Sequence, residues 1–197
     1  MLTGCTARSA KLYGTTLSRW KPDIPLSSLD QLLRNIYTRA TMSWTCDSCG
    51  EEIQTADQGY VEWFTRTDGQ GHRIGRDLRL VHHAPASPRQ PDANCYRDEA
   101  HERRQDGSAV RTYPLRQLLG HDGLMLLFSM LSEDEAPKVE LLELAKRIHI
   151  PGYEEARPHF RTAMDEGVFA PNMPDGYYWQ QQIRAVLEWV RAGGAND

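Results

Sequence analysis

The chain has 197 residues, of which 40% are hydrophobic, and a formal net charge of −4 at pH 7. A chain of this length can bury one large core or two small ones, and we expect two small ones. Its apolar runs fall short of the roughly 18 residues that a membrane-spanning helix requires. The composition therefore excludes a helical membrane protein and predicts a soluble one.

Residues 1–42 form the first segment, which is rich in Ser and Thr and has one short helical candidate over 27–38. Organelle transit peptides share this composition, but a weakly ordered basic extension requires fewer assumptions. Met42 stands directly before the motif that opens the folded part, so translation from Met42 is an alternative. We expect residues 1–42 either to be weakly ordered or not to belong to the native protein.

A cysteine pair, Cys46 and Cys49, follows in the run 45–50, which ends at Gly50. Two thiolates separated by two residues can bind one metal ion from a tight turn, and glycine permits the positive φ that the turn requires. The spacing therefore predicts half of a zinc site. Cysteines that are available as metal-binding thiolates indicate a reducing compartment, so we expect a cytoplasmic protein.

The next part of the chain has strand-like patterns. Residues 59–66 are rich in β-branched and aromatic side chains, and residues 77–83 alternate between two faces. The glycine-containing run 68–71 between them predicts a hairpin turn. A proline-rich loop over 84–94 then leads to Cys95. We predict a two-stranded hairpin whose following loop brings Cys95 to the cysteine pair.

Strand alternation decides which histidine completes the metal site. His82 shares a strand face with Leu78 and Leu80 and should point inward, while His83 should face outward with Val81. Four protein ligands leave no open coordination position. We therefore expect a structural Zn²⁺ site that stabilises a small domain with little apolar core. The predicted ligands are Cys46, Cys49, His82 and Cys95.

From residue 115 onward the hydrophobic period becomes helical. Pro158 should bend the third of the predicted helices or delay its start. The last helix is amphipathic and could either cover the core or form the seam of a homodimer. The predicted elements are helices over 115–132, 137–148, 153–166 and 180–192, and a β-hairpin over 168–179.

Three helices followed by a hairpin resemble a winged-helix domain in their order. The resemblance implies that the third helix enters the DNA major groove, where Arg157, His159 and Arg161 would meet bases or phosphates. Acidic residues on the same helix, and a wing without Lys or Arg, work against duplex binding.

The sequence thus predicts an α+β protein with two modules. Residues 43–114 are similar to a zinc ribbon and should form a small zinc-stabilised β module. Residues 115–197 should form a winged helix-turn-helix-like domain with an additional C-terminal helix.

The region around the paired histidines also resembles the ββα-metal core of HNH nucleases. The resemblance implies that His83 activates water and that His101 holds a divalent metal ion. The pattern departs from that family because a second downstream cysteine pair is absent and the segment is acidic. The residues that carry the resemblance are His82-His83-Ala84-Pro85, Asn94-Cys95 and His101.

The leading functional hypothesis is a non-enzymatic adaptor or regulator in a protein or nucleoprotein assembly. Residues 115–197 carry eight basic and thirteen acidic residues, which disfavours autonomous binding to duplex DNA. A protein partner is expected because Tyr177, Tyr178 and Trp179 are of the types enriched at interface hot spots. The alternative is a winged-helix DNA-binding transcriptional regulator, and a second alternative is an HNH-like metal-dependent nuclease.

Overall fold

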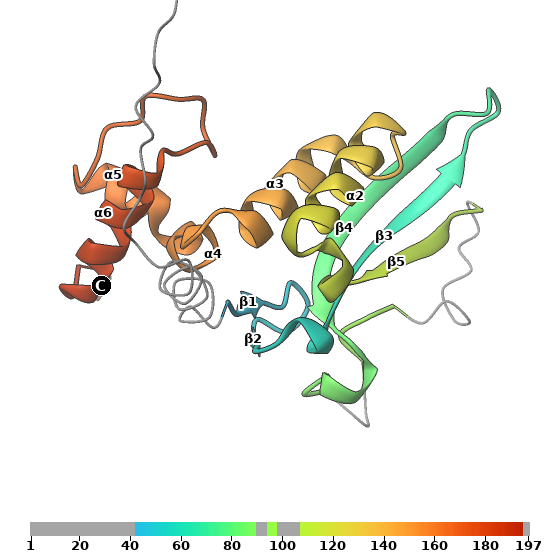
Figure 1. Cartoon of the computed structure of the whole chain (residues 1–197), viewed down its shortest axis with the longest axis horizontal. Helices are drawn as coiled ribbons and strands as arrows, with labels where there is room; N and C mark the ends of the chain where they lie inside the picture. Colours follow the sequence, from blue (N-terminus) through green and yellow to red (C-terminus); the bar gives the residue numbers. More distant parts are fainter. Residues whose placement is uncertain (1–41, 90–93, 98–106, 195–197) are drawn as a thin grey trace, which may run out of the picture. The chain divides into compact units, whose positions relative to one another are not determined.

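A computed structural model of the chain describes residues 42–89, 94–97 and 107–194. Figure 1 shows the chain and the numbering of its elements. The helix predicted over 27–38 lies outside these ranges, as does nearly all of the segment predicted to be weakly ordered. Within the described part of the chain, no helix combines the length and the apolar character that crossing a membrane would require.

The cysteine pair lies in a small turn, which we call the knuckle (residues 44–53). Its two short strands, β1 (Trp44–Thr45) and β2 (Glu52–Ile53), pair antiparallel. A backbone hydrogen bond from Gly50 N to Cys46 O (2.9 Å) closes the turn. Gly50 has a φ of 79°, so the left-handed conformation predicted for this glycine is confirmed.

A three-stranded antiparallel sheet follows, in the order β4-β3-β5. Strands β3 (Gly59–Thr67) and β4 (Arg73–His82) form the predicted hairpin. The third strand, β5 (Ala109–Pro114), pairs with β3 and was not predicted.

The hairpin turn between β3 and β4 is organised by Asp68. Its Oδ1 accepts hydrogen bonds from the backbone N–H groups of His72 and Gln70, both at 2.8 Å. These bonds hold the pKa of the Asp68 carboxyl below its usual value. Beyond this turn the register of the hairpin shifts between Glu62 and Phe64, and His82 then lies opposite Gly59.

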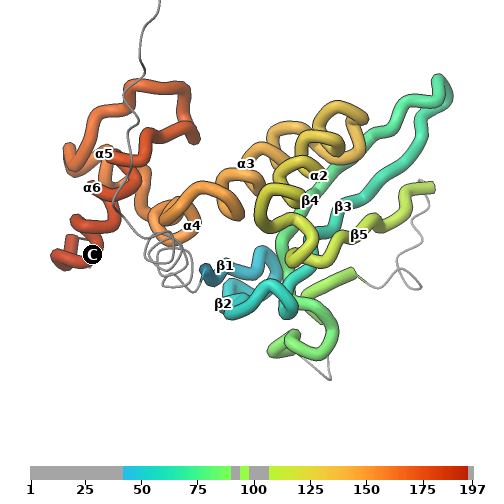
Figure 2. Tube along the Cα trace, in the orientation of Figure 1, coloured from blue at the N-terminus to red at the C-terminus, as the bar shows by residue number. Residues whose placement is uncertain are grey.

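Two helices cover one face of the sheet (Figure 1), and Figure 2 follows the same chain path as a tube. The 3-10 turn η3 (Leu115–Leu118) leads into α2 (Gly120–Ser132), which is followed by α3 (Lys138–His149). Trp63 donates a hydrogen bond from Nε1 to Glu135 O (2.7 Å) in the connection between these helices. The fully buried core residues include Ile53, Val61, Leu80, Leu115, Leu118, Leu127, Met130, Leu141 and Leu144.

The third predicted helix, over 153–166, is interrupted. It is divided into α4 (Tyr153–Ala156), the 3-10 turn η4 (Arg157–His159) and α5 (Phe160–Asp165). Pro158 lies within the 3-10 turn, and its missing N–H cannot support a regular α-helical ladder. The predicted effect of Pro158 accounts for the break.

The last helix, α6 (Gln180–Arg191), reproduces the predicted amphipathic helix. Ile183 and Val186 are fully buried in the cluster that α6 forms with α4 and α5. The apolar face of α6 therefore packs within the chain, and a homodimer seam on this helix would require other residues.

The prediction of a β-hairpin over 168–179 was wrong. Within the described residues this segment contains turns and irregular backbone but no strand. Tyr178 packs on Phe160, with ring centroids 4.1 Å apart, and on Phe169, at 5.6 Å. The ring of Tyr178 therefore packs against core aromatic residues, and it does not pair with a side chain on a neighbouring strand. The α+β class is confirmed, but the wing on which the winged-helix resemblance partly depended is not formed.

The buried residues form two clusters. The larger cluster contains residues from Trp44 to Ile148 and joins the knuckle, the sheet, α2 and α3 in one core. The smaller cluster begins at Tyr153 and lies between α4, α5 and α6. The predicted modules 43–114 and 115–197 therefore share the larger core.

Gly123 lies where α2 contacts the preceding 3-10 turn. A Cβ atom at this position would lie 2.1 Å from the carbonyl carbon of Leu118, so alanine would push two backbone segments apart. We expect Gly123→Ala to lower the free energy of unfolding by about 2–3 kcal/mol, despite alanine's higher helix propensity. At Gly69 a Cβ would meet no atom within 4 Å, so Gly69→Ala is the control. Urea unfolding measures both, and equal stabilities would contradict the close contact.

Candidate metal centre

Three sulfur donors and one nitrogen donor converge beside the knuckle. The ligand atoms of Cys46, Cys49, His82 and Cys95 all lie within 4.8 Å of one another. Cys49 is half-buried and the other three residues are buried. Donors placed in this way could hold a single metal ion. The structure thus brings together the four residues that the sequence predicted as ligands.

Each ligand reaches the cluster from its own local structure. Cys46 and Cys49 belong to the knuckle turn, which β1 and β2 close. His82 is the last residue of β4, so the register of the hairpin sets its position. Cys95 lies in a separate segment, 94–97. A bound ion would therefore connect three parts of the chain.

The segment 94–97 is anchored by hydrogen bonds on either side of the ligand position. Cys95 N donates to Ser87 Oγ (3.2 Å), and this oxygen lies 3.2 Å from Cys95 Sγ. Arg97 N donates to Oε2 of Glu62 (2.9 Å), whose side chain is fully buried in the sheet. The thiol of Cys95 is thereby held against the end of β4.

The hydrogen bonds of His82 orient its ring toward the cysteines. Nδ1 lies 3.5 Å from Cys49 Sγ, and Nε2 lies 3.2 Å from Glu52 O. Because a carbonyl oxygen can only accept, Nε2 carries the proton and Nδ1 presents its lone pair to the thiols. Usual zinc bond lengths in a tetrahedron separate sulfur and nitrogen ligands by about 3.6 Å, so this pair fits one edge of such a site.

The two knuckle thiols have different acidities. Burial raises the pKa of Cys49 to about 12. Burial also acts to raise the pKa of Cys46, but backbone hydrogen bonds at Cys49, Ser48 and His82 outweigh it and leave this pKa below its ordinary value. A divalent cation stabilises the thiolates that coordinate it. Protons should therefore compete with the metal, and affinity should fall as the pH falls.

His83 lies outside the cluster. It is half-buried, and its ring packs on Tyr60 with the ring centroids 4.4 Å apart. The choice of His82 over His83 agrees with this placement. Val81, which was expected to face outward with His83, is fully buried, because both faces of the sheet are covered at this end.

The residues of the HNH resemblance are only partly described. His101 lies outside the described ranges. His83, expected to activate water in such a nuclease, has its Nδ1 atom buried and without a hydrogen-bond partner in the described part of the chain. The nuclease alternative stays a prediction from the sequence.

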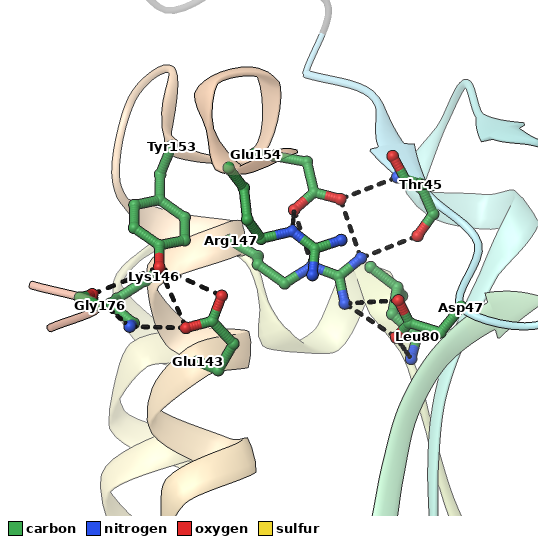
Figure 3. Close-up of polar contacts among 10 residues, drawn as sticks. Thr45, Asp47, Leu80, Glu143, Lys146, Arg147, Tyr153, Glu154 and Gly176 are labelled. Carbon is green, nitrogen blue, oxygen red and sulfur yellow. Dashed lines mark hydrogen bonds and ion pairs between the residues drawn. The ribbon is translucent and has the colours of Figure 1, made fainter. Parts of the chain in front are cut away.

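An arginine network, Arg147 with Asp47, Glu154 and Thr45, fixes the knuckle to the helices (Figure 3). Arg147 on α3 has a side chain that is only 5% exposed. It donates to both carboxylate oxygens of Asp47 (3.0 and 2.8 Å), to both of Glu154 (2.7 and 2.9 Å) and to Thr45 O (2.8 Å). Thr45 N in turn donates to Glu154 Oε1 (2.9 Å).

The electrostatics of this network favour a permanently charged arginine. Burial acts to lower the pKa of Arg147, but hydrogen bonds to Glu154 and the negative charge of Asp47 raise it above its ordinary value. Asp47 directly follows the ligand Cys46. The network therefore connects the position of the metal ligands to α3 and α4.

The three residues predicted to read DNA do not lie on one regular α-helix. Arg157 is half-buried and pairs with Glu154 (3.4 Å). His159 is half-buried in the 3-10 turn. Arg161 is exposed but pairs with Asp165 (3.4 Å). The break in the predicted helix separates these residues among η4 and α5.

Three residues that shape the site were not predicted. Ser87 has no sequence signal beyond its place in a proline-rich loop, and Arg147 and Glu154 lie about one hundred positions from the knuckle residues that they contact.

Comparisons with known protein families, curated proteins and solved structures found no match. The function therefore has to be inferred from the residues and their geometry.

Proposed function

We propose that the protein is a non-enzymatic adaptor or regulator that binds structural Zn²⁺ and contributes a protein-binding groove to a protein or nucleoprotein assembly. Three thiols and one imidazole in a compact cluster are the donor set that zinc prefers. Four protein donors leave no coordination position for water or substrate. The ion would then hold the knuckle, β4 and the segment 94–97 together.

The adaptor proposal depends on an apolar groove of about 370 Å³, which is lined by residues of α3 and α4 and by the segment that leads into α6. Four large hydrophobic residues in it are exposed: Ile150 by 37%, Met173 by 45%, Tyr177 by 41% and Trp179 by 58%. Clustered exposed apolar side chains mark interaction sites, and Tyr and Trp dominate interface hot spots. The lining residues are Lys146, Ile150, Tyr153, Met173, Tyr177, Tyr178, Trp179 and Gln180.

Lys146 fixes one wall of the groove. Its Nζ donates to Gly176 O (2.6 Å) and pairs with Glu143 (2.6 Å), contacts that are drawn in Figure 3. The same ammonium lies over the rings of Tyr153 (5.1 Å) and Tyr177 (4.6 Å). A wall that is held in this way loses little conformational entropy when a partner binds.

Trp179→Ala should weaken the binding of a partner by about tenfold or more, because it removes the most exposed wall of the groove. The tagged protein is purified from its native cells, and co-purifying proteins are quantified by mass spectrometry. The leading partner is then purified and titrated against wild type and variant. Met125→Ala is the matched control, because Met125 is 65% exposed but does not line the groove.

Equal recovery and equal affinity for wild type and Trp179→Ala would contradict the groove as the binding surface. Tight binding of random duplex DNA that weakens steeply with salt would instead support the transcriptional regulator. Nicking of DNA that depends on Mg²⁺ or Mn²⁺ and is abolished by His83→Ala would support the nuclease.

A further inference from the structure

Around Leu78 and Leu80, the β4 edge of the three-stranded sheet is protected by the chain itself. Leu80 N donates to Asp47 Oδ2 (2.7 Å), and Asp47 N donates to Leu80 O (2.8 Å). Leu78 N donates to Glu140 Oε2 (2.5 Å). These contacts satisfy the outward groups of β4 at Leu78 and Leu80 and prevent another strand from pairing with that part of the edge.

The register shows which groups of β5 face away from the sheet. His83 N donates to Gln58 O (2.7 Å), so this antiparallel pair is of the hydrogen-bonded kind. Hydrogen-bonded and non-hydrogen-bonded pairs alternate along an antiparallel ladder. The even-numbered residues of β3 therefore direct their backbone N–H and C=O groups to β4, and the odd-numbered residues direct theirs to β5. The β5 residues opposite the odd-numbered positions are Ala109, Arg111 and Tyr113.

The alternate residues Val110 and Thr112 consequently direct their N–H and C=O groups outward. Within residues 42–89, 94–97 and 107–194 these groups have no hydrogen-bond partner. Pro114, the next outward residue, has no N–H, which is typical of an edge strand. Arg111 and Thr112 are both exposed although they lie on opposite faces, so the strand is accessible from both sides.

Arginine side chains surround this open edge. Arg73 and Arg111 line a cavity of about 240 Å³, and both also line a second one of about 480 Å³ together with Arg66. Arg73 forms an ion pair with Glu135 (3.3 Å). In the described part of the chain, neither Arg66 nor Arg111 forms an ion pair. The edge therefore offers unneutralised positive charge in a chain whose net charge is −4.

We propose that the outer edge of β5 binds an extended acidic segment of a partner protein, which adds to the sheet as a fourth strand. Backbone hydrogen bonds to Val110 and Thr112 provide affinity, and carboxylates on one face of the added strand pair with Arg111, while Arg66 on the opposite face adds to the positive charge. The inference rests on the proposed adaptor function. It uses a different surface from the groove, so each can fail while the other holds.

A single-stranded nucleic acid, which is also an anion, fits this surface less well. Such ligands bind by stacking bases on exposed aromatic rings. The aromatic residues beside the arginines are Trp63, which is 2% exposed, and Tyr113, which is half-buried. Their rings stack on each other with centroids 5.8 Å apart and offer no free face between them. An open strand edge without an exposed ring favours a peptide.

The test uses a short blocked peptide in which glutamate alternates with valine, and a counterpart with glutamine in place of glutamate. With the full-length zinc-loaded protein, we expect the glutamate peptide to bind about tenfold more tightly than the glutamine peptide. Amide hydrogen exchange at Val110 and Thr112 should slow by about tenfold when the glutamate peptide is added. Exchange at Leu78 and Leu80, on the protected edge, should not change.

Two variants separate the charge from the strand edge. Arg111→Gln should lower the affinity for the glutamate peptide by about fivefold and leave the affinity for the glutamine peptide unchanged. Thr112→Pro removes one outward N–H and should weaken both peptides. Metal content and thermal unfolding show whether Thr112→Pro is folded, and Arg111→Gln decides the result if it is not. Trp179→Ala, which alters only the groove, should bind the glutamate peptide as the wild type does.

Binding that leaves exchange at Val110 and Thr112 unchanged would overturn the edge proposal. Loss of peptide binding in Trp179→Ala would also overturn it, since the peptide would then occupy the groove and the adaptor function would stand. Tighter binding of oligothymidylate than of the glutamate peptide would assign the arginines to nucleic acid and equally overturn it. Failure of the groove experiment alone would leave the strand-edge result intact.

Discussion

Removal of the Zn²⁺ ion that we propose for the cluster of three cysteines and His82 is expected to unfold the larger core. The ion would connect the knuckle, the end of β4 and the segment 94–97, which are far apart in the sequence. Structural zinc contributes on the order of 10 kcal/mol of apparent binding free energy, which is comparable to the total stability of a domain of about 5–15 kcal/mol. Circular dichroism during titration with a strong chelator should therefore show a cooperative loss of helix and strand signal.

Ligand substitutions should reproduce the effect of the chelator. Cys95→Ser and His82→Ala are each expected to lose the metal and to lower the melting temperature strongly. His83→Ala should retain it, because the ring of His83 packs on Tyr60 and not on the cluster. Cys5→Ser, outside the described residues and outside the predicted ligand set, is the second control. Elemental analysis should give about one zinc per chain in the wild type and in both controls.

The coordination sphere provides an independent check. X-ray absorption should show three sulfur ligands at about 2.3 Å and one nitrogen at about 2.0–2.1 Å. A full complement of zinc in both Cys95→Ser and His82→Ala would contradict the proposed ligand set. A water oxygen among the ligands of the wild type would mean that one coordination position is not filled by protein, and it would support an enzymatic role.

The parts of the fold that were predicted correctly depend on short-range patterns. The spacing of Cys46 and Cys49, with Gly50 behind them, specifies the knuckle because all three act within one turn. The alternation along β4 identified His82 because a strand fixes the side of each residue. Helical periodicity likewise predicted α2, α3 and α6, since their apolar faces pack on the cores.

The errors arise where packing overrides a local pattern. The aromatic run at Tyr177 and Tyr178 has strong strand propensity, yet Tyr178 packs on Phe160 and no hairpin forms. Strand β5 carries few apolar residues and follows a highly charged stretch, so its pairing with β3 left no clear signal. Contacts such as Arg147 with Asp47 join residues about one hundred positions apart, and no periodicity reports them.

Arg147→Ala is expected to destabilise the protein by about 3–5 kcal/mol, because it removes the arginine that two largely buried carboxylates share and leaves Glu154 with Arg157 alone. The side chains of Asp47 and Glu154 are 25% and 10% exposed, so water would solvate them poorly. The substitution also removes the hydrogen bonds from α3 to Thr45 and Asp47 in the knuckle, and zinc should therefore dissociate faster. Urea unfolding measures the first effect, and a chromophoric chelator measures the second.

The controls distinguish the buried network from an ordinary ion pair. Arg161 pairs with Asp165 at 3.4 Å, but these side chains are 85% and 67% exposed, so Arg161→Ala should change stability little. Adding Asp47→Asn and Glu154→Gln to Arg147→Ala should restore part of the loss, because neutral amides cost less to bury than unpaired charges. If Arg147→Ala and Arg161→Ala were equally mild and zinc release did not change, the knuckle would be held by the metal and the core alone.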